Sequence, residues 1–210
     1  ACRKLFDSPD AVVAPSQFVL DEYVQAGFFA RSKKVVIKNP VALNSPLPPF
    51  NLRGGAHENV PPLRLRGGKE GLLFLFIGQL EPYKGLRVLI KAWRIFAARH
   101  PDAQLEIVGQ GSMEAELARA AQMIPGIALR GFVPHPELGA LFNGTRATIM
   151  PSLAYETFGM TVAESLAHNV PVIASRIGAL PEIVQESING ILVEPGDEQA
   201  LQNALERVIK

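Results

Sequence analysis

The sequence predicts a doubly wound α/β fold for residues 71–210, in which helices cover both faces of a parallel sheet. Two observations lead to this prediction. Strand-like and helix-like segments alternate with short connections from Gly71 onward. Several strand-like segments, such as residues 72–77, 172–174 and 191–193, are apolar throughout instead of alternating with polar residues, which is typical of strands buried on both faces. In sheets of this class, ligands bind beyond the carboxyl ends of the strands.

The predicted strands are short apolar runs, and the predicted helices lie between them. The strands are expected at residues 72–77, 104–108, 127–130, 148–150, 172–174 and 191–193. The helices are expected at about residues 85–99, 113–123, 136–143, 159–167, 180–185 and 198–208. Candidate binding residues are therefore expected in the loops that follow the strands, at residues 78–84, 109–111, 131–134, 151–158 and 175–178.

Two further segments precede this domain. Residues 10–40 predict a β-α-β unit with a strand at residues 11–14, a Ser16 helix cap, a helix at residues 17–26 that Gly27 ends, and a strand at residues 35–37. These strands are too few to stand alone, so we expect residues 1–40 to be a fragment of another α/β domain. Residues 41–70 are rich in proline and glycine and are expected to form an irregular linker.

The composition is that of an ordinary globular protein. Its 210 residues are 48% hydrophobic and 20% charged, and a net charge of +1 gives no reason to expect a nucleic-acid partner. No apolar run could span a bilayer, and the first residues do not resemble a signal peptide, so a cytoplasmic location is expected by default. The one cysteine, Cys2, can form neither an internal disulfide nor a cysteine metal site. Because the first residue is not Met, the chain is expected to be part of a longer one.

Two glutamates, Glu156 and Glu164, are the first candidate binding residues. A predicted strand ends at Met150, the following loop carries Glu156, and a helix is expected to begin near Phe158 or Gly159. If helical rise applied throughout, their spacing would separate the two carboxylates by about 12 Å, enough to hold both ends of a long polar ligand. Apolar neighbours indicate that Glu164 lies near a buried edge, where it needs hydrogen-bond donors from the protein or from a ligand. A solvated helix face is the alternative for Glu164.

Lys84 and the glycines near residue 110 are weaker candidates. A lysine at a helix start opposes the helix dipole, so a bound anion such as phosphate would explain Lys84; an exposed lysine without a ligand is the alternative. Gly109 and Gly111 form half of a dinucleotide-binding fingerprint, but Glu114 stands where the third glycine is required. A tight turn with Ser112 as a helix cap is the preferred interpretation.

Two histidines, His135 and His168, occur in loop-like segments. Neither has an acidic partner at a spacing that is diagnostic of catalysis, so neither is predicted to be catalytic. The sequence contains no cluster of residues with metal-ligand spacing, and no metal site is predicted.

From about Phe74 to Asp197 the sequence resembles the C-terminal, donor-binding half of retaining glycosyltransferases with the GT-B fold, family 4. The resemblance depends on the order of several motifs, of which no single one is specific. They are Gly78–Gln79–Leu80 with Lys84–Gly85, Val108–Gly109–Gln110–Gly111, Gly131–Phe132–Val133, Pro151 to Glu164, Gly178 with Pro181–Glu182, and Asn189–Gly190 with Pro195–Gly196–Asp197. It implies a Rossmann-like nucleotide-sugar domain at residues 71–210 and a remnant of an N-terminal acceptor domain at residues 1–40.

The resemblance also implies roles for individual residues. Glu156 would contact hydroxyl groups of the donor sugar, Glu164 those of the ribose, and Lys84 the diphosphate, with Glu156 and Lys84 as the catalytic residues. The other residues expected in the nucleotide-sugar site are Gly78, Gln79, Gly109, Gly111, Phe132, Val133, Phe158, Gly159 and Met160. No cofactor or metal is implied, because lysine and helix N–H groups would stabilise the leaving diphosphate.

Gln79 is a departure from the family, which usually has an arginine there, so the leaving group would face one positive charge fewer. In this family the acceptor site belongs to the N-terminal domain. We therefore expect the chain as given to bind a nucleotide sugar but to transfer it poorly, to an acceptor that the sequence does not identify. Pro134 offers no side-chain acceptor for guanine, which favours a uracil nucleotide.

Three alternatives remain open. A nucleotide-sugar epimerase of the same fold would keep the nucleotide site, but the segment from Pro151 to Glu164 argues against it. A nucleotide-sugar-binding module without catalysis is suggested by Gln79 alone. A dinucleotide-dependent dehydrogenase is disfavoured by Glu114.

Overall fold

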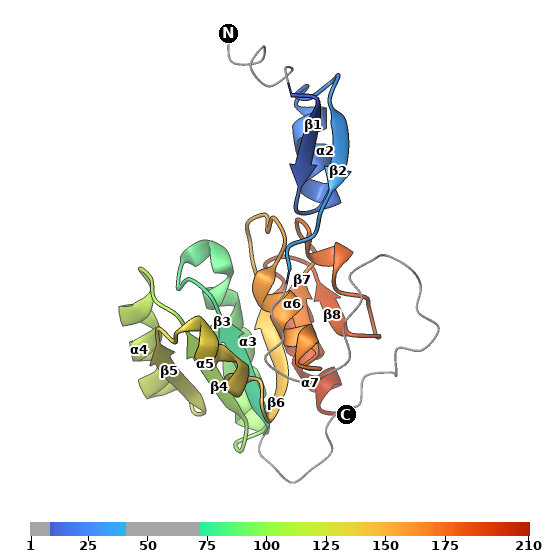
Figure 1. Cartoon of the computed structure of the whole chain (residues 1–210). Coiled ribbons are helices and arrows are strands. Elements are labelled where there is room, and N and C mark those ends of the chain that lie inside the picture. Colours follow the sequence, from blue (N-terminus) through green and yellow to red (C-terminus); the bar gives the residue numbers. More distant parts are fainter. Residues whose placement is uncertain (1–8, 41–71) are drawn as a thin grey trace.

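The computed structural model describes residues 9–40 and 72–210. These ranges form a six-stranded sheet with its helices and a separate two-stranded unit near the N-terminus (Figure 1). Cys2 and the predicted linker at residues 41–70 lie outside the described residues. Among the residues that are described, no helix combines the length and the apolar character that crossing a bilayer requires.

The larger sheet is parallel at every pair of neighbouring strands. Its order is β5-β4-β3-β6-β7-β8, so the chain starts in the middle, runs out to one edge, and returns to the middle before running to the other. This order creates a topological switch point between β3 and β6. The strands are β3 (Leu73–Ile77), β4 (Gln104–Val108), β5 (Ile127–Gly131), β6 (Thr145–Met150), β7 (Val172–Ser175) and β8 (Gly190–Val193).

Helices follow these strands in the chain and cover both faces of the sheet (Figure 1). They are α3 (Leu86–Arg99), α4 (Glu114–Met123), α5 (His135–Leu141), α6 (Met160–Ala167) and α7 (Glu198–Val208). Two short 3-10 helices, η1 (Pro82–Lys84) and η2 (Leu180–Glu182), follow β3 and β7. The predicted doubly wound α/β class is confirmed.

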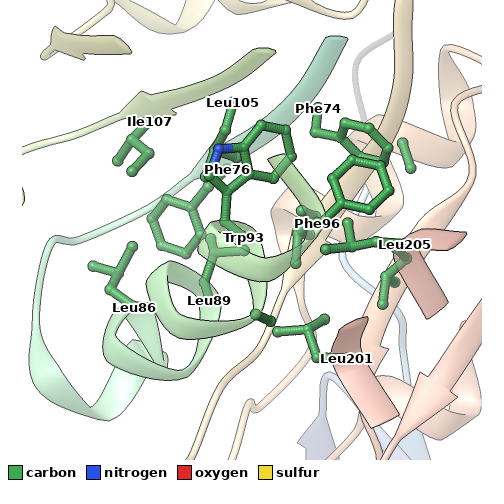
Figure 2. Packing of buried hydrophobic residues seen from close by; sticks show 14 of the residues in the cluster. Phe74, Phe76, Leu86, Leu89, Trp93, Phe96, Leu105, Ile107, Leu201 and Leu205 are labelled. Carbon is green, nitrogen blue, oxygen red and sulfur yellow. The ribbon is translucent and has the colours of Figure 1, made fainter. Parts of the chain in front are cut away.

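Alternate residues of β3 enter cores on opposite faces of the sheet. Phe74 packs against Trp93 and Phe96 of α3, with ring centroids 5.5 and 5.4 Å away, and leucines of α7 lie beside these rings (Figure 2). Leu75 and Ile77 belong to a second cluster, against which partly buried residues of α5 pack. Both faces of the strand are therefore buried, which is why its sequence is apolar throughout.

The strand β6 begins three residues earlier than predicted, at Thr145. The first two side chains of β6 are polar, which hides the strand from an analysis of apolar runs, but both are hydrogen-bonded to the protein. The Thr145 hydroxyl donates to the Leu141 carbonyl at 2.7 Å, and Arg146 Nε donates to the Val208 carbonyl at 2.9 Å. Polar groups that are satisfied in this way can enter a buried strand at little cost.

The helix predicted at residues 180–185 is instead the three-residue η2. The Gln185 N–H donates to the side-chain oxygen of Asn189 at 2.7 Å. It is therefore not available to the Pro181 carbonyl four residues earlier, which an α-helix would require.

The N-terminal unit has the predicted β-α-β order, with β1 (Ala11–Ala14), α2 (Gln17–Gln25) and β2 (Lys33–Val36). Its two strands pair in parallel. The Ser16 hydroxyl accepts the N–H of Val19 at 3.2 Å, so the predicted helix cap is confirmed. The start of α2 contacts the loops that follow β6 and β7, at the carboxyl edge of the larger sheet (Figure 1).

Candidate functional site

Lys84 and Glu156 lie at the switch point of the sheet. Lys84 is the last residue of η1, which follows β3, and Glu156 lies in the loop between β6 and α6. The strands β3 and β6 are neighbours, but the chain leaves them for opposite edges of the sheet. Doubly wound sheets bind ligands at this position.

The two side chains form an ion pair that is sheltered from water. The Lys84 ammonium donates to Glu156 Oε1 at 2.7 Å, and the hydroxyl of the fully buried Ser152 donates to the same oxygen at 2.6 Å. The side chains of Lys84 and Glu156 are only 16% and 15% exposed. Because burial removes water from both charges, the additional bond from Ser152 helps to compensate the carboxylate. Glu156 thus balances the lysine charge without any ligand.

Main-chain contacts join the two loops that carry this pair. The Leu153 N–H donates to the Tyr83 carbonyl at 2.7 Å. Gly85 has a φ of +74°, and a Cβ atom there would lie 1.8 Å from the Pro151 carbonyl oxygen. Only glycine permits both this conformation and this approach. The separation between the loops is therefore set by the backbone as well as by the ion pair.

The loop after β7 supports the main chain of Glu156. The Ala179 N–H donates to the Glu156 carbonyl at 2.8 Å. Gly178 has a φ of +59°, and a Cβ atom at this position would lie 2.6 Å from both the nitrogen and the carbonyl oxygen of Glu156. Glu156 is thus held through its side chain by one loop and through its backbone by another.

The helix α6 begins directly after this loop. Its N-cap is Gly159, with a φ of +86°, and no side chain of the described residues caps it. Phe158 is buried, whereas Met160 is exposed. The first N–H groups of a helix have no intrahelical acceptor, so those of α6 can donate to an anion. Because α6 begins at Met160, the helical rise assumed between Glu156 and Glu164 applies to only part of that segment.

Glu164 lies on α6 and has a side chain only 13% exposed, as its apolar neighbours predicted. Its Oε1 atom is 2.9 Å from Nε2 of His135, the first residue of α5. This pair could not be predicted from the sequence because the two residues are 29 positions apart, and no local spacing reveals it. The side chain of His135 is 63% exposed, so this partner of Glu164 lies largely in solvent.

Gly78 and Gly109 bring the ends of β3 and β4 together. The Gly78 N–H donates to the Val108 carbonyl at 3.0 Å. A Cβ atom on Gly109, which has a φ of +140°, would lie 1.8 Å from the Gly78 carbonyl oxygen. Gln79 follows directly, and its side-chain oxygen accepts the hydroxyl of Tyr83. The residue that replaces the expected arginine is therefore bonded to the protein itself.

The interpretation of Ser112 as a helix cap is wrong. The N-cap of α4 is Met113, which makes no side-chain cap bond. The Ser112 hydroxyl and N–H both donate to Glu81, at 2.6 and 2.9 Å, and these bonds lower the pKa of the Glu81 carboxyl. The Gly111 N–H donates to Glu114 at 3.0 Å. Protein carboxylates thus occupy the N–H groups that a phosphate would use in a dinucleotide fingerprint.

The loop after β5 leads into α5. Phe132 is 68% exposed, whereas Val133 packs against the cluster that contains Leu75 and Ile77. Val133 therefore anchors this loop, and the ring of Phe132 remains accessible to a ligand.

Metal-ligand residues do not cluster in the part of the chain that the structure describes. Across residues 9–40 and 72–210, no group of three or more His, Cys, Asp and Glu side chains could hold a metal ion.

Sequence comparison identifies the family. The model for "Glycosyl transferases group 1" matches residues 71–210, and the chain belongs to this family. An uncharacterized glycosyltransferase of Methanocaldococcus jannaschii is 32% identical over 140 residues, which are 65% of this chain. A D-inositol 3-phosphate glycosyltransferase of an Arthrobacter species is 32% identical over 154 residues, or 70% of the chain. The aligned region is 35% of the length of each of these relatives.

Structural comparison places the fold among GT-B glycosyltransferases. A sucrose-phosphate synthase of Thermosynechococcus elongatus aligns with a TM-score of 0.76 and 24% identity, covering 99% of this chain and 51% of that one. The Anabaena protein HepE, solved with UDP and glucose, aligns with a TM-score of 0.73 and 24% identity, covering 96% of this chain and 54% of that one.

Proposed function

We propose that this chain is the donor-binding part of a retaining glycosyltransferase. It binds a nucleotide diphosphate sugar and, together with an N-terminal acceptor-binding domain, transfers the hexose to an acceptor hydroxyl. The observation that carries the proposal is the sheltered cluster of Lys84, Glu156 and Ser152 at the switch point, next to the start of α6. Membership of the group 1 glycosyltransferases and the UDP and glucose bound by HepE support it.

Lys84 and the N–H groups of α6 provide positive potential for the leaving group. Transfer breaks the bond between the anomeric carbon and a phosphate oxygen, so negative charge develops on the diphosphate. The anomeric carbon bonds to the acceptor oxygen on the same face, and the acceptor proton passes to the phosphate oxygen that leaves. Donors that are in place before the reaction stabilise such charge without reorganisation. Lys84 and the start of α6 thus stabilise the leaving diphosphate, a task that a metal ion has in other transferases.

Glu156 holds hydroxyl groups of the sugar. Among the described residues, both donors to its carboxylate bond to Oε1, so Oε2 remains available as an acceptor. A carboxylate oxygen suits a sugar hydroxyl, because hydrogen bonds to a charged acceptor are stronger than neutral ones. Since its position is set by two loops, Glu156 can orient the sugar for the reaction rather than attack it.

Glu164 binds the ribose. Its side chain is mostly shielded from water, and the contact of its carboxylate within the described residues is with His135 through Oε1. Adjacent ribose hydroxyl groups can use Oε2 and, when the exposed imidazole moves, Oε1 as well. The base then lies against the loop that carries Phe132 and Val133, and Pro134 makes uracil the favoured base.

A thermal-shift titration of this chain tests the proposal. UDP-, GDP-, ADP- and dTDP-sugars are added separately, each with and without EDTA, and NAD is the comparison ligand. We expect one class of nucleotide sugar, a UDP-sugar first, to raise the melting temperature with a saturable dose dependence that EDTA does not change. Stabilisation by NAD and by none of the nucleotide sugars would contradict the proposal.

A matched pair of lysine variants links the titration to the site. Lys84→Ala should weaken the binding of the nucleotide sugar by at least about tenfold, because it removes a charged donor from the diphosphate. Lys91→Ala removes an exposed lysine that pairs with Glu198, and should leave binding unchanged. Equal affinities in the two variants would exclude Lys84 from the site.

A binding module without catalysis is the second candidate, and Gln79 favours it. The side chain that replaces the expected arginine is bonded to Tyr83 and carries no charge. Assay of the protein joined to its acceptor domain separates the two functions. Turnover of the nucleotide sugar supports the transferase, whereas binding without turnover supports the module.

A further inference from the structure

We propose that the start of α2, held by the carboxylate of Glu182, is a positioning element for Glu156. The inference rests on the proposed function, in which Glu156 contacts the donor sugar. Ser16 and Glu182 are positioning residues in this account, because they act through the loop of Glu156 and not on the ligand.

Glu182 binds the N-terminus of a helix that is remote in the sequence. Its two carboxylate oxygens accept the N–H groups of Gln17 and Phe18, the first two residues of α2, at 3.1 and 2.7 Å. The first turn of α2 contains no acidic residue of its own. The negative charge that complements the dipole of α2 therefore comes from η2, on the larger domain.

Ser16 connects α2 to the neighbour of Glu156. Its oxygen caps α2 by accepting the N–H of Val19, and its hydroxyl hydrogen is donated to the Thr157 carbonyl at 2.7 Å. A serine hydroxyl has a single hydrogen, so this donor is committed to Thr157. Ser16 is 1% exposed, and water does not compete for these bonds.

A ring contact holds the other neighbour of Glu156. Phe18 of α2 packs edge-on against Tyr155, with ring centroids 5.0 Å apart. The start of α2 therefore contacts the residues on both sides of Glu156. Through Glu182 it also contacts the loop whose Ala179 N–H binds the Glu156 carbonyl.

These contacts connect the position of the N-terminal unit to the site. When α2 is in this position, it contacts Tyr155 and Thr157, and the loop after β7 binds the main chain of Glu156 between them. The backbone then sets the direction of the Glu156 carboxylate. When α2 moves away, Thr157 and Tyr155 lose their partners, and the carboxylate keeps only Lys84 and Ser152. The selectivity of the site for the sugar part of the donor should then fall.

The variant Glu182→Ala tests this inference, with Glu22→Ala as the matched control. Glu22 is an exposed glutamate of α2 whose side chain does not contact the start of the helix. The first measurement is amide hydrogen exchange of the ligand-free chain. In Glu182→Ala we expect exchange about tenfold faster at the amides of Gln17 and Phe18, because charged hydrogen bonds are lost, and faster exchange across residues 156–158. The control should leave both segments unchanged.

The second measurement compares affinities for UDP-glucose and UDP. Glu182→Ala should weaken the binding of UDP-glucose by about three- to tenfold, whereas the affinity for UDP should change by less than about twofold, since only the sugar contact depends on Glu156. The variant Glu182→Gln keeps an acceptor without the charge, and should restore part of the selectivity. A loss of stability alone would weaken the binding of both ligands equally, and Glu182→Gln would then restore no selectivity.

Two results overturn the inference. The first is unchanged exchange across residues 156–158 in Glu182→Ala, which would show that α2 does not order the segment. The second is faster exchange with an unchanged ratio of UDP-glucose affinity to UDP affinity, which would show that ordering this segment does not affect the contact between Glu156 and the sugar. If wild-type protein binds neither ligand, the proposed function fails, and the exchange measurement still decides whether α2 orders the loop.

Discussion

Glu156 and Glu164 are both nearly buried and both follow β6, but they are held in different ways. The partners of Glu156 are a sheltered lysine and a fully buried serine on two loops joined by backbone contacts. The partner of Glu164 is one histidine, which is 63% exposed. The orientation of Glu156 is therefore set before any ligand binds, whereas the partner of Glu164 can be exchanged.

This difference suits the two proposed roles, in which Glu156 orients the sugar and Glu164 holds the ribose. A group that orients a reacting sugar must be in position beforehand, because reorganisation during the reaction raises the barrier. A group that holds a ribose needs only to offer acceptors when the nucleotide arrives. Each of the following variants changes one of the two glutamates or the residues that hold it.

The largest loss of stability is expected from Glu156→Ala, because Lys84 is then shielded from water but has lost its carboxylate partner. Removing one partner of a buried ion pair is costly, so the free energy of unfolding should fall by about 3 kcal/mol in chemical denaturation. Glu116→Ala is the control, since its pair with Arg87 is 42–59% exposed and should contribute less than about 1 kcal/mol. Equal losses in both variants would show that burial does not distinguish the switch-point pair.

A second test changes the backbone support of Glu156. Gly178→Ala places a Cβ atom 2.6 Å from the Glu156 main chain at a positive φ, so we expect a loss of about 3 kcal/mol. Gly144→Ala is a control at a similar φ of +79° with open space around it, and should cost about 1 kcal/mol. Thermal unfolding of both variants measures the difference. A Gly178→Ala variant as stable as the control would mean that the loop accommodates the added Cβ atom at little cost in free energy.

Glu164→Ala should change binding more than folding. We expect about tenfold weaker binding of UDP by isothermal titration, because the ribose loses a charged acceptor. The free energy of unfolding should change little, since the partner that remains, His135, is largely solvated.

The smallest effect is expected from His135→Ala. An exposed partner contributes little, so stability should change by less than about 0.5 kcal/mol and UDP affinity by less than about threefold. A loss of affinity as large as in Glu164→Ala would make His135 a part of the nucleotide site in its own right.

Most of the fold could be predicted from the sequence because burial on both faces leaves a plain pattern. The predicted segments of strands such as β3 and β7 are uninterrupted apolar runs, and their ends agree within a residue or two. The prediction was incomplete where tertiary bonds replaced that pattern. Thr145 and Arg146 are polar residues inside β6, and the Asn189 side chain ends η2 by taking the N–H of Gln185.

The site was predictable as a location but not as a set of contacts. Topology places Lys84 and Glu156 at one edge of the sheet, since each follows a strand at the switch point. Their ion pair could not be predicted, because it depends on how two loops close against each other. The contact between His135 and Glu164 has the same origin, as it joins two helices through their side chains.

The affinities of Glu156→Ala and Glu164→Ala for UDP-glucose and UDP test the division of labour most directly. We expect Glu156→Ala to weaken the binding of UDP-glucose and to leave UDP affinity nearly unchanged, and Glu164→Ala to weaken the binding of both ligands to the same extent. Unchanged UDP affinity in Glu164→Ala, or equal losses for both ligands in a folded Glu156→Ala protein, would contradict it.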